Sequence, residues 1–246
     1  MKRNLMIALM LVMVFSLLAA CGGNADPASV ASNNQVIPSA SSSVTPTSSS
    51  VSMPANSTVT SGALVSKVND EATLGTYSEK DIEWQTLAID QENGKALLIA
   101  KDCIVVMPYH SADSAEATWE TSTLRAWLNA EFYETAFNSE DQLLILETEL
   151  TTEPNSETGI AGGNDTIDKV FVLSEAEVRK YFATDEAMIA QFGGENVSWW
   201  TRTSGINIRS SVCTYKGGDL YTTGNHNDTE GVGVRPAMWI SLVSDE

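Results

Sequence analysis

Downstream of Cys21, the most reactive side chains in the sequence are Cys103, Cys213, His110 and His226. Both cysteines lie in apolar runs typical of strands, which predicts buried free thiols that pack as small hydrophobic groups. A disulfide between them is the alternative, because an exported location permits it. Cys103 and His110 could form a nucleophile and base, but no third, orienting group stands at a recognisable spacing. Neither histidine has a partner at metal-ligand spacing, so we expect ordinary loop histidines.

A polar loop over residues 151–168 is the first candidate binding segment. Its last seven residues, 162–168, contain the candidate ligand-binding side chains Asn164, Asp165 and Asp168. Ca²⁺ takes about six to eight oxygen ligands, so Asp165 and Asp168 are also candidate metal ligands. The spacing differs from that of an EF-hand loop. The alternative is that these side chains cap the turn and the start of the next strand.

A second polar loop over residues 224–232 offers Asn225, Asn227 and Asp228 as candidate ligand-binding residues. Loops on a rigid scaffold often carry binding residues, and amides and acids suit sugar hydroxyls. The alternative is a plain solvent-exposed loop. Neither loop supplies a nucleophile, base and metal in a recognisable set, so we predict no catalytic residues and no resident cofactor apart from the Ca²⁺ considered above.

Three arginines, Arg125, Arg202 and Arg235, stand close to tryptophans in a strongly acidic sequence. Guanidinium groups stack on aromatic faces and pair with carboxylates. We therefore expect these arginines to be structural first and to contact a ligand second.

The elements that must position these residues follow from apolar patterning and turn residues. Asn93-Gly94 between two apolar runs predicts a hairpin, and Ser122 and Ser174 are predicted to begin helices. Trp199 and Trp200 should be core residues on opposite faces of one strand, and Trp239 should be a core residue of the last strand. Pro236 predicts an edge or a bulge. The expected strands cover residues 83–90, 95–100, 103–107, 169–173, 198–202, 211–215, 220–223 and 233–241.

The N-terminus has the three-part layout of a secretory signal. Lys2 and Arg3 precede an apolar run that is shorter than the roughly 20 residues of a spanning helix. The run ends Leu18-Ala19-Ala20-Cys21, which resembles the bacterial lipobox. That resemblance implies removal of residues 1–20 and a diacylglycerol on Cys21, which holds the protein to the extracytoplasmic side of the cell membrane. An ordinary cleaved signal or an anchor helix is the alternative.

Composition divides the remaining chain at about residue 70. Sixteen of the 41 residues 22–62 are Ser or Thr and none is aromatic, so we predict a lipidated, disordered linker over residues 21–70 and a globular domain over 71–246. Removing residues 1–20 removes Lys2 and Arg3 and no acid, which changes the net charge from −18 to −20. This charge excludes a nucleic-acid partner, because phosphates would be repelled.

Four stretches together resemble the domain of unknown function 6273 family, which is known from many bacterial exported proteins. They are residues 119–129, 162–174, 199–205 and 233–240, and the resemblance covers about residues 73–243. Trp199-Trp200-Thr201-Arg202 and Gly233-Val234-Arg235-Pro236 are also similar to the end of formylglycine-generating-enzyme domains, which have a C-type-lectin-like fold. That enzyme uses two nearby reactive cysteines late in its domain, and Cys103 and Cys213 do not match this pattern.

Strands first, helices in the middle and strands last predict an α+β domain. The second resemblance implies a single C-type-lectin-like domain with a twisted antiparallel sheet, a few short helices and long loops. We expect a non-catalytic, lipid-anchored binding module of the cell envelope, with a glycan or a protein as its ligand. An oxidoreductase similar to the formylglycine-generating enzyme and a structural envelope protein without a small ligand are the alternatives.

Overall fold

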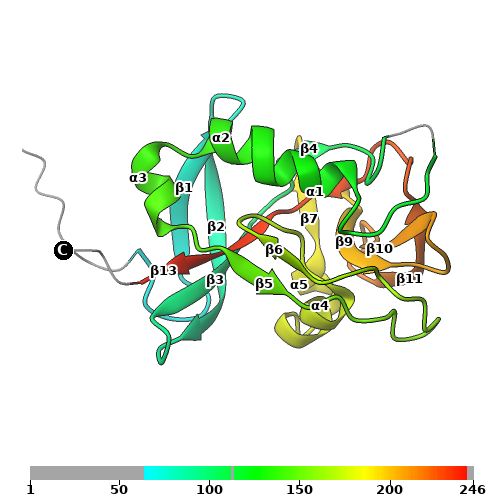
Figure 1. Cartoon of the computed structure of the whole chain (residues 1–246). Helices are drawn as coiled ribbons and strands as arrows, with labels where there is room; N and C mark the ends of the chain where they lie inside the picture. Colours follow the sequence, from blue (N-terminus) through cyan, green and yellow to red (C-terminus); the bar gives the residue numbers. More distant parts are fainter. Residues whose placement is uncertain (1–63, 112–113, 243–246) are drawn as a thin grey trace, which may run out of the picture. The chain divides into compact units, whose positions relative to one another are not determined.

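The computed structural model describes residues 64–111 and 114–242, which lie within the compact unit Ser57–Glu246. Helices and strands are mixed, as expected of an α+β domain, and the two main sheets contain four and five strands (Figure 1). Their orders are β1-β2-β3-β13 and β11-β10-β9-β12-β4. Within the described ranges, no helix is long and apolar enough to cross a membrane.

The four-stranded sheet joins the start of the described chain to its end. β1 (Glu71–Tyr77), β2 (Lys80–Asp90) and β3 (Lys95–Ala100) form an antiparallel meander, and β13 (Ala237–Ser241) pairs with β3. The predicted hairpin is confirmed. Asp90 lies opposite Lys95, and Gly94 has a φ of 59°, a conformation that glycine adopts without a steric penalty.

The fold begins before residue 71, which corrects the predicted end of the linker. Val65 is only 2% exposed, and the Asp70 carboxylate accepts hydrogen bonds from the backbone amides of Ser66 and Lys67. The Thr86 amide donates to the Asp70 carbonyl at 2.9 Å. Residues 64–70 therefore belong to the folded unit, because they bury an apolar side chain and pair with β2. The predicted signal, Cys21 and the linker up to residue 63 lie outside the described residues.

The far end of a helical segment lies against β1 of the four-stranded sheet (Figure 1). It consists of α1 (Thr123–Trp127), the π-helical turn η1 (Leu128–Phe132) and α2 (Tyr133–Ala136), followed by α3 (Ser139–Leu144). The Ser122 hydroxyl accepts from the Arg125 amide, which confirms the predicted N-cap. A side chain at Gly75 would lie 2.7 Å from the Ala136 carbonyl oxygen, so glycine allows α2 to approach β1 this closely.

The middle of the chain contains short elements and the long polar loop. β5 (Thr148–Leu150) pairs with β6 (Thr166–Asp168), and the loop joins them. The strand predicted over residues 169–173 is wrong: the strand lies at residues 166–168, and the buried segment that follows makes one bridge, from Phe171 to Ala237. Residues 170–173 are all buried, and a short continuous apolar run of this kind cannot be distinguished from a core strand by its sequence pattern.

α4 (Glu175–Tyr181) begins with the predicted capping box, in which Ser174 and Glu177 bond to each other's backbone amides. α5 (Asp185–Met188) leads into a small hairpin of β7 (Ala190–Phe192) and β8 (Glu195–Val197), which was not among the strands expected from the sequence.

The five-stranded sheet contains β9 (Trp199–Ser204), β10 (Ser210–Thr214), β11 (Leu220–His226), β12 (Gly233–Val234) and β4 (Val105–Val106). Of the strand predicted over residues 103–107, only Val105–Val106 forms a strand, β4, which is half-buried at the edge of this sheet. The single strand predicted over residues 233–241, with an edge or a bulge at Pro236, is wrong. Pro236 separates β12 from β13, and the chain leaves the five-stranded sheet for the four-stranded one at this point.

Candidate functional site

Asp168 is a buried structural carboxylate, which corrects its prediction as a ligand or metal-binding residue. Its side chain has no exposed surface and accepts hydrogen bonds from Trp119 Nε1 and Thr166 Oγ1, both at 2.8 Å. Arg125 Nε donates to its other oxygen at 2.7 Å. Both carboxylate oxygens thus already accept from protein donors, and the charge that a cation would supply is already present on Arg125.

Asn227 is likewise structural, which corrects its prediction as a binding residue. It is completely buried, and its Oδ1 accepts from the Ser211 hydroxyl at 2.8 Å. Its Nδ2 donates to the carbonyls of Ala115 at 2.9 Å and Ile208 at 3.1 Å. Asn225 lies in β11, not in a loop, and is half-buried with its amide 3.3 Å from Cys213 Sγ. The side chains of Asn225 and Asn227 therefore bond to neighbouring segments of the chain.

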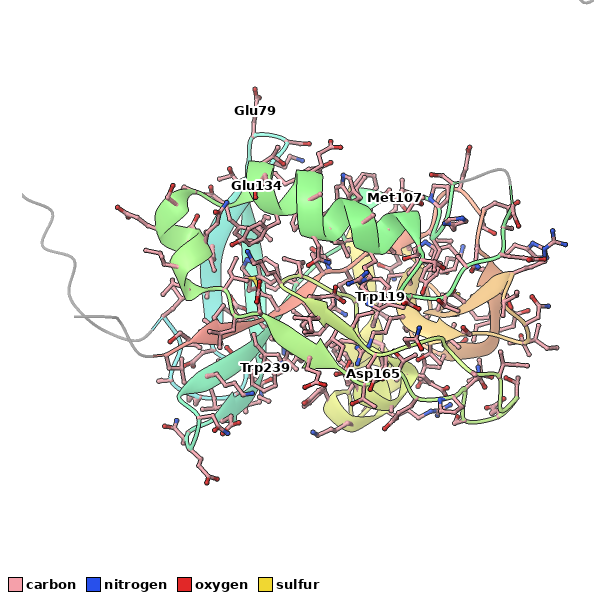
Figure 2. All side chains as sticks on the ribbon, in the orientation of Figure 1. Glu79, Met107, Trp119, Glu134, Asp165 and Trp239 are labelled. Carbon is pink, nitrogen blue, oxygen red and sulfur yellow. The ribbon has the colours of Figure 1, made fainter. Side chains whose placement is uncertain are left out.

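Asn164, Asp165 and Asp228 are exposed. Asp165 Oδ1 accepts from the Thr152 amide at 2.6 Å, on the outer loop between β5 and β6 (Figure 2). Asn164 Nδ2 donates to the Glu120 carboxylate at 2.9 Å, and Asp228 lies 3.7 Å from His226 Nδ1. In the described part of the chain, no three His, Cys, Asp or Glu side chains are placed to hold a metal ion.

The two downstream cysteines are buried free thiols, as the first interpretation expected, and the alternative disulfide between them is not formed. Burial raises the pKa of each thiol to about 12. Both groups are therefore protonated at neutral pH, and a protonated thiol is a poor nucleophile.

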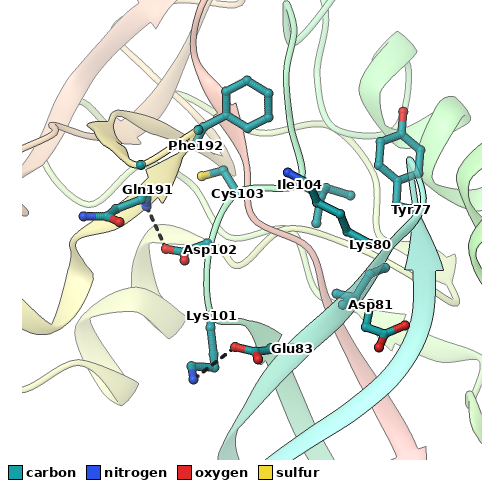
Figure 3. A pocket seen from close by; sticks show the side chains of 13 residues that line it. Tyr77, Lys80, Asp81, Glu83, Lys101, Asp102, Cys103, Ile104, Gln191 and Phe192 are labelled. Atoms are coloured by element: carbon teal, nitrogen blue, oxygen red, sulfur yellow. Dashed lines mark hydrogen bonds and ion pairs between the residues drawn. The ribbon is translucent and has the colours of Figure 1, made fainter.

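A cleft of about 290 Å³ lies beside Cys103 and is the best candidate for a functional site (Figure 3). Three segments form it: the β1–β2 turn with the start of β2, residues 101–104, and the β7–β8 hairpin. Its apolar surface comes from Ile82, Cys103, Ile104 and Phe192. The Phe192 side chain is 38% exposed, a large fraction for an aromatic ring in a folded domain.

Charged side chains of both signs surround this apolar surface. Lys101 Nζ lies 3.0 Å from the Glu71 carboxylate and 3.3 Å from that of Glu83, and these bonds raise the pKa of Lys101. The Asp102 carboxylate accepts from the Gln191 amide at 2.8 Å, which ties the hairpin to the opposite side of the cleft. The cleft therefore has a fixed charged rim around an apolar floor (Figure 3).

A buried cation lies behind the cleft. Arg235 is 2% exposed, and its guanidinium carbon is 5.3 Å from the ring centroids of both Phe182 and Trp199. Its Nε donates to the Ala100 carbonyl at 2.8 Å. Burial lowers the pKa of Arg235 to about 10, while the nearby charge of Asp102 acts in the opposite direction. The residue is a structural strut, as expected.

The three tryptophans that were predicted to be core residues have different outcomes. Trp199 and Trp200 are fully buried on opposite sides of β9, with Trp199 donating to Met188 of α5 and Trp200 donating to Met107. Trp239 is only partly buried, so its assignment to the core is wrong (Figure 2). Lys95 Nζ lies 4.7 Å from the centroid of its ring.

Sequence reasoning missed the cleft because its three sides are far apart in the sequence. Gly193-Gly194, the tip of the β7–β8 hairpin, was the available local signal. Both glycines have positive φ values, 63° and 86°, as a tight hairpin turn requires. The turn predicts a hairpin but does not indicate what the hairpin faces.

Comparison with known proteins agrees with one of the two family resemblances. A model of the family described as "Domain of unknown function (DUF6273)" matches residues 93–242. The chain belongs to this family. The DUF6273 match runs from the β2–β3 turn to the end of β13 and includes two of the three sides of the cleft, residues 101–104 and 191–194. No curated protein and no solved structure matches the chain.

Proposed function

We propose that the protein is a lipid-anchored, non-catalytic binding module on the extracytoplasmic side of the bacterial cell membrane. The cleft beside Cys103 binds an exposed segment of a partner protein. The observation that carries this proposal is the combination of an apolar floor with an exposed Phe192 and a rim of fixed charges of both signs. Interfaces typically have an apolar, aromatic centre and a polar rim.

The contents of the cleft favour binding over catalysis. Cys103 is its only thiol, and the raised pKa of about 12 keeps it protonated. No histidine is among the residues that line the cleft, and Lys101 is held by two carboxylates. Nucleophilic catalysis needs an activated nucleophile with a base within reach, and this set supplies neither.

The charge of the rim favours a protein segment over a glycan. Lys80, Asp81, Glu83, Lys101 and Asp102 present both signs within one cleft, which matches the mixed charges of a polypeptide. The strong net negative charge of the chain favours a partner surface with an excess of basic residues. The glycan alternative rests on the exposed Asn164, Asp165 and Asp228.

We also propose that the domain has a C-type-lectin-like fold. The support is topological: the last strand, β13, pairs with the hairpin that opens the domain, and the segment between them carries the long loops. The membrane attachment rests on Leu18-Ala19-Ala20-Cys21. Replacing Cys21 with Ser should move the protein from the membrane fraction to the soluble fraction, and a protein that stays quantitatively with the membrane would contradict lipid anchoring.

Photo-crosslinking in living cells tests the cleft. A photoreactive amino acid is placed at Phe192, at the edge of the cleft, and in a matched control at Leu143, which is 80% exposed and does not line the cleft. We expect a discrete protein adduct only from position 192, and its loss when Lys101 is replaced with Glu. Equal crosslinking from both positions, or glycan binding that persists after Phe192→Ala, would refute the proposed site.

A further inference from the structure

The cleft beside Cys103 lies where β2 loses one of its two neighbouring strands. β3 ends at residue 100, and one further backbone bond joins the two segments, from the Lys101 amide to the Glu83 carbonyl at 2.9 Å. Continued in the same register, the pairing would place Cys103 opposite Asp81. Instead, the chain turns away, and the Cys103 amide donates to the Gln191 carbonyl at 2.9 Å. The start of β2 is therefore paired with β1 alone.

Asp81 consequently has backbone groups that face the cleft without a partner. Successive residues of a strand direct their amide and carbonyl groups to alternate sides. The Glu83 carbonyl points away from β1, toward residue 101, so the amide and carbonyl of Asp81 point the same way. Among the residues that the structure describes, none on this side of β2 bonds to these two groups or to the Glu83 amide. Asp81, Ile82 and Glu83 all line the cleft, so the open edge lies inside it (Figure 3).

An unpaired strand edge is a template for another extended chain, and proteins commonly cover such edges. Two outer strands of this domain are covered by the chain itself. Asn155 Nδ2 donates to the Thr222 carbonyl of β11 at 2.9 Å, and Ile145 and Phe171 form bridges to β13. The start of β2 instead borders the cleft of about 290 Å³.

The two faces of this open edge differ in character. The side chains of Asp81 and Glu83 are exposed and point to one face, where Glu83 pairs with Lys101 at 3.3 Å. Ile82 points to the other face and is only 4% exposed, and Phe192 supplies further apolar surface in the cleft. An extended chain with alternating apolar and charged side chains therefore fits the edge.

We propose that the partner segment binds as an added β-strand beside Asp81, in the position that β3 leaves open. Its backbone bonds to the amide and carbonyl of Asp81 and to the Glu83 amide. Its apolar side chains contact Ile82 and Phe192, and a basic side chain pairs with the exposed Asp81 carboxylate. In strand addition, the backbone bonds give affinity and the alternate side chains give specificity. This inference rests on the proposed function and adds the conformation and the side-chain pattern of the partner segment.

Hydrogen exchange in the ¹⁵N-labelled full chain gives the first test. Without partner, the amides of Asp81 and Glu83 should exchange faster than that of Trp84, which faces β1. The probe is the peptide identified by mass spectrometry in the Phe192 adduct and then synthesised. It should slow exchange at Asp81 and Glu83 and leave Trp84 unchanged. Slow exchange at Asp81 in the free protein would contradict the open edge.

The outcomes separate this inference from the proposed function. A discrete adduct at position 192 with a peptide that leaves exchange at Asp81 and Glu83 unchanged shows docking through side chains alone, and only the added strand is then wrong. The absence of an adduct at position 192 overturns the cleft as a binding site, and the added strand with it.

N-Methylation of single amides along the same peptide tests the strand pairing independently. Every second amide of an added strand points to β2, so methylation should weaken binding by about three- to ten-fold at alternate positions and by less than about two-fold at the positions between them. Similar effects at all positions, or effects without this alternation, would rule out the added strand.

Asp81→Pro removes the amide that faces the cleft. Proline is tolerated where the amide of a strand residue has no ladder partner, so the β1–β2 pairing should persist. The variant should bind the peptide about three- to ten-fold more weakly than Asp81→Ala, which loses the same carboxylate and keeps the amide. Thermal unfolding shows whether the proline variant is folded, and if it is not, the methylated peptides decide. Equal affinities of two folded variants would contradict the bond to the Asp81 amide.

Discussion

At the scale of single residues, Cys103 and Gly233 share a space that admits no further atoms. A side-chain carbon at Gly233 would lie 2.5 Å from Cys103 Sγ and 3.1 Å from the Ser198 carbonyl oxygen. The thiol therefore packs against the backbone of β12, where it forms the back of the cleft. The cysteine is explained by its size, since a small hydrophobic side chain fits here and its raised pKa keeps it uncharged.

Gly233→Ala should lower the free energy of unfolding by about 1–3 kcal/mol, because overpacking displaces Cys103 or the β12 backbone. Combining it with Cys103→Ala should recover part of this loss, and the non-additivity is measured by chemical denaturation of both single variants and the double variant. Gly217→Ala is the control, because the nearest atom to its added carbon is 3.7 Å away. Strict additivity of the two substitutions would contradict the contact.

The two buried thiols predict a loss of stability at alkaline pH. Each has its pKa raised from an ordinary value of 9.0 to about 12, so above pH 9 the unfolded state releases protons that the folded state retains. Stability is therefore complete below pH 9 and declines above it, by up to about 1.4 kcal/mol per pH unit for each thiol. Arg235, with its pKa lowered to about 10, acts in the opposite direction from about pH 10 upward.

Between pH 9 and 10, the chain should lose more stability than the double variant Cys103→Ala, Cys213→Ala. Thermal unfolding at each pH measures the difference, and below pH 9 the two stability curves should run parallel, separated by the constant packing cost of the substitutions. Parallel curves across this interval would show that the thiols ionise alike in the folded and unfolded states.

At the scale of elements, β9 and β13 place their tryptophans in different environments. All six residues of β9 are buried, because this strand lies inside the five-stranded sheet and both of its faces are covered. β13 is the last strand of the four-stranded sheet, and its outer face leaves Trp239 partly exposed beside Lys95. A strand's alternation thus predicts opposite faces, whereas neighbouring elements decide which faces are covered.

Trp200→Ala should lower the free energy of unfolding by about 3–5 kcal/mol, because it empties a fully buried site and leaves the Met107 carbonyl without its donor. Trp239→Ala is the matched comparison and should cost less than half as much. Chemical denaturation compares the two variants. Equal losses would contradict the difference in burial between the two strands.

At the scale of the whole molecule, the fold is closed by contacts between segments that are distant in sequence. β13 pairs with β3, and residues 64–70 pair with β2 ahead of the first strand. Val65 belongs to the core, whereas Val68, three residues later, is 49% exposed. The segment is therefore anchored by one apolar side chain and by hydrogen bonds to the Thr86 backbone.

Val65→Ala should lower the free energy of unfolding by about 1.5–3 kcal/mol, from two lost methylene equivalents and the resulting cavity. Val68→Ala should change it by less than about 0.5 kcal/mol, because that side chain is largely solvated. Hydrogen exchange provides a second measurement, in which the Thr86 amide should lose protection in the first variant only. Similar effects of the two substitutions would place the start of the fold after residue 70.

The sequence by itself determined the local features of this protein. Asn93-Gly94 specified a hairpin, Ser122 and Ser174 specified helix starts, and the alternation in β9 specified opposite faces for its tryptophans. Four motifs in the domain also indicated the DUF6273 family. These features depend on neighbouring residues, whose backbone preferences and spacing are visible in a linear chain.

Only the tertiary structure decided which polar side chains are available to a ligand. Asp168 and Asn227 lie in the same polar segments of the sequence as Asp165 and Asp228. The first two are buried among protein donors and acceptors, whereas the other two are exposed. The cleft beside Cys103 likewise combines segments that are dozens of residues apart. A carboxylate or a guanidinium becomes structural or free according to the partners that folding brings to it, and those partners come from other parts of the chain.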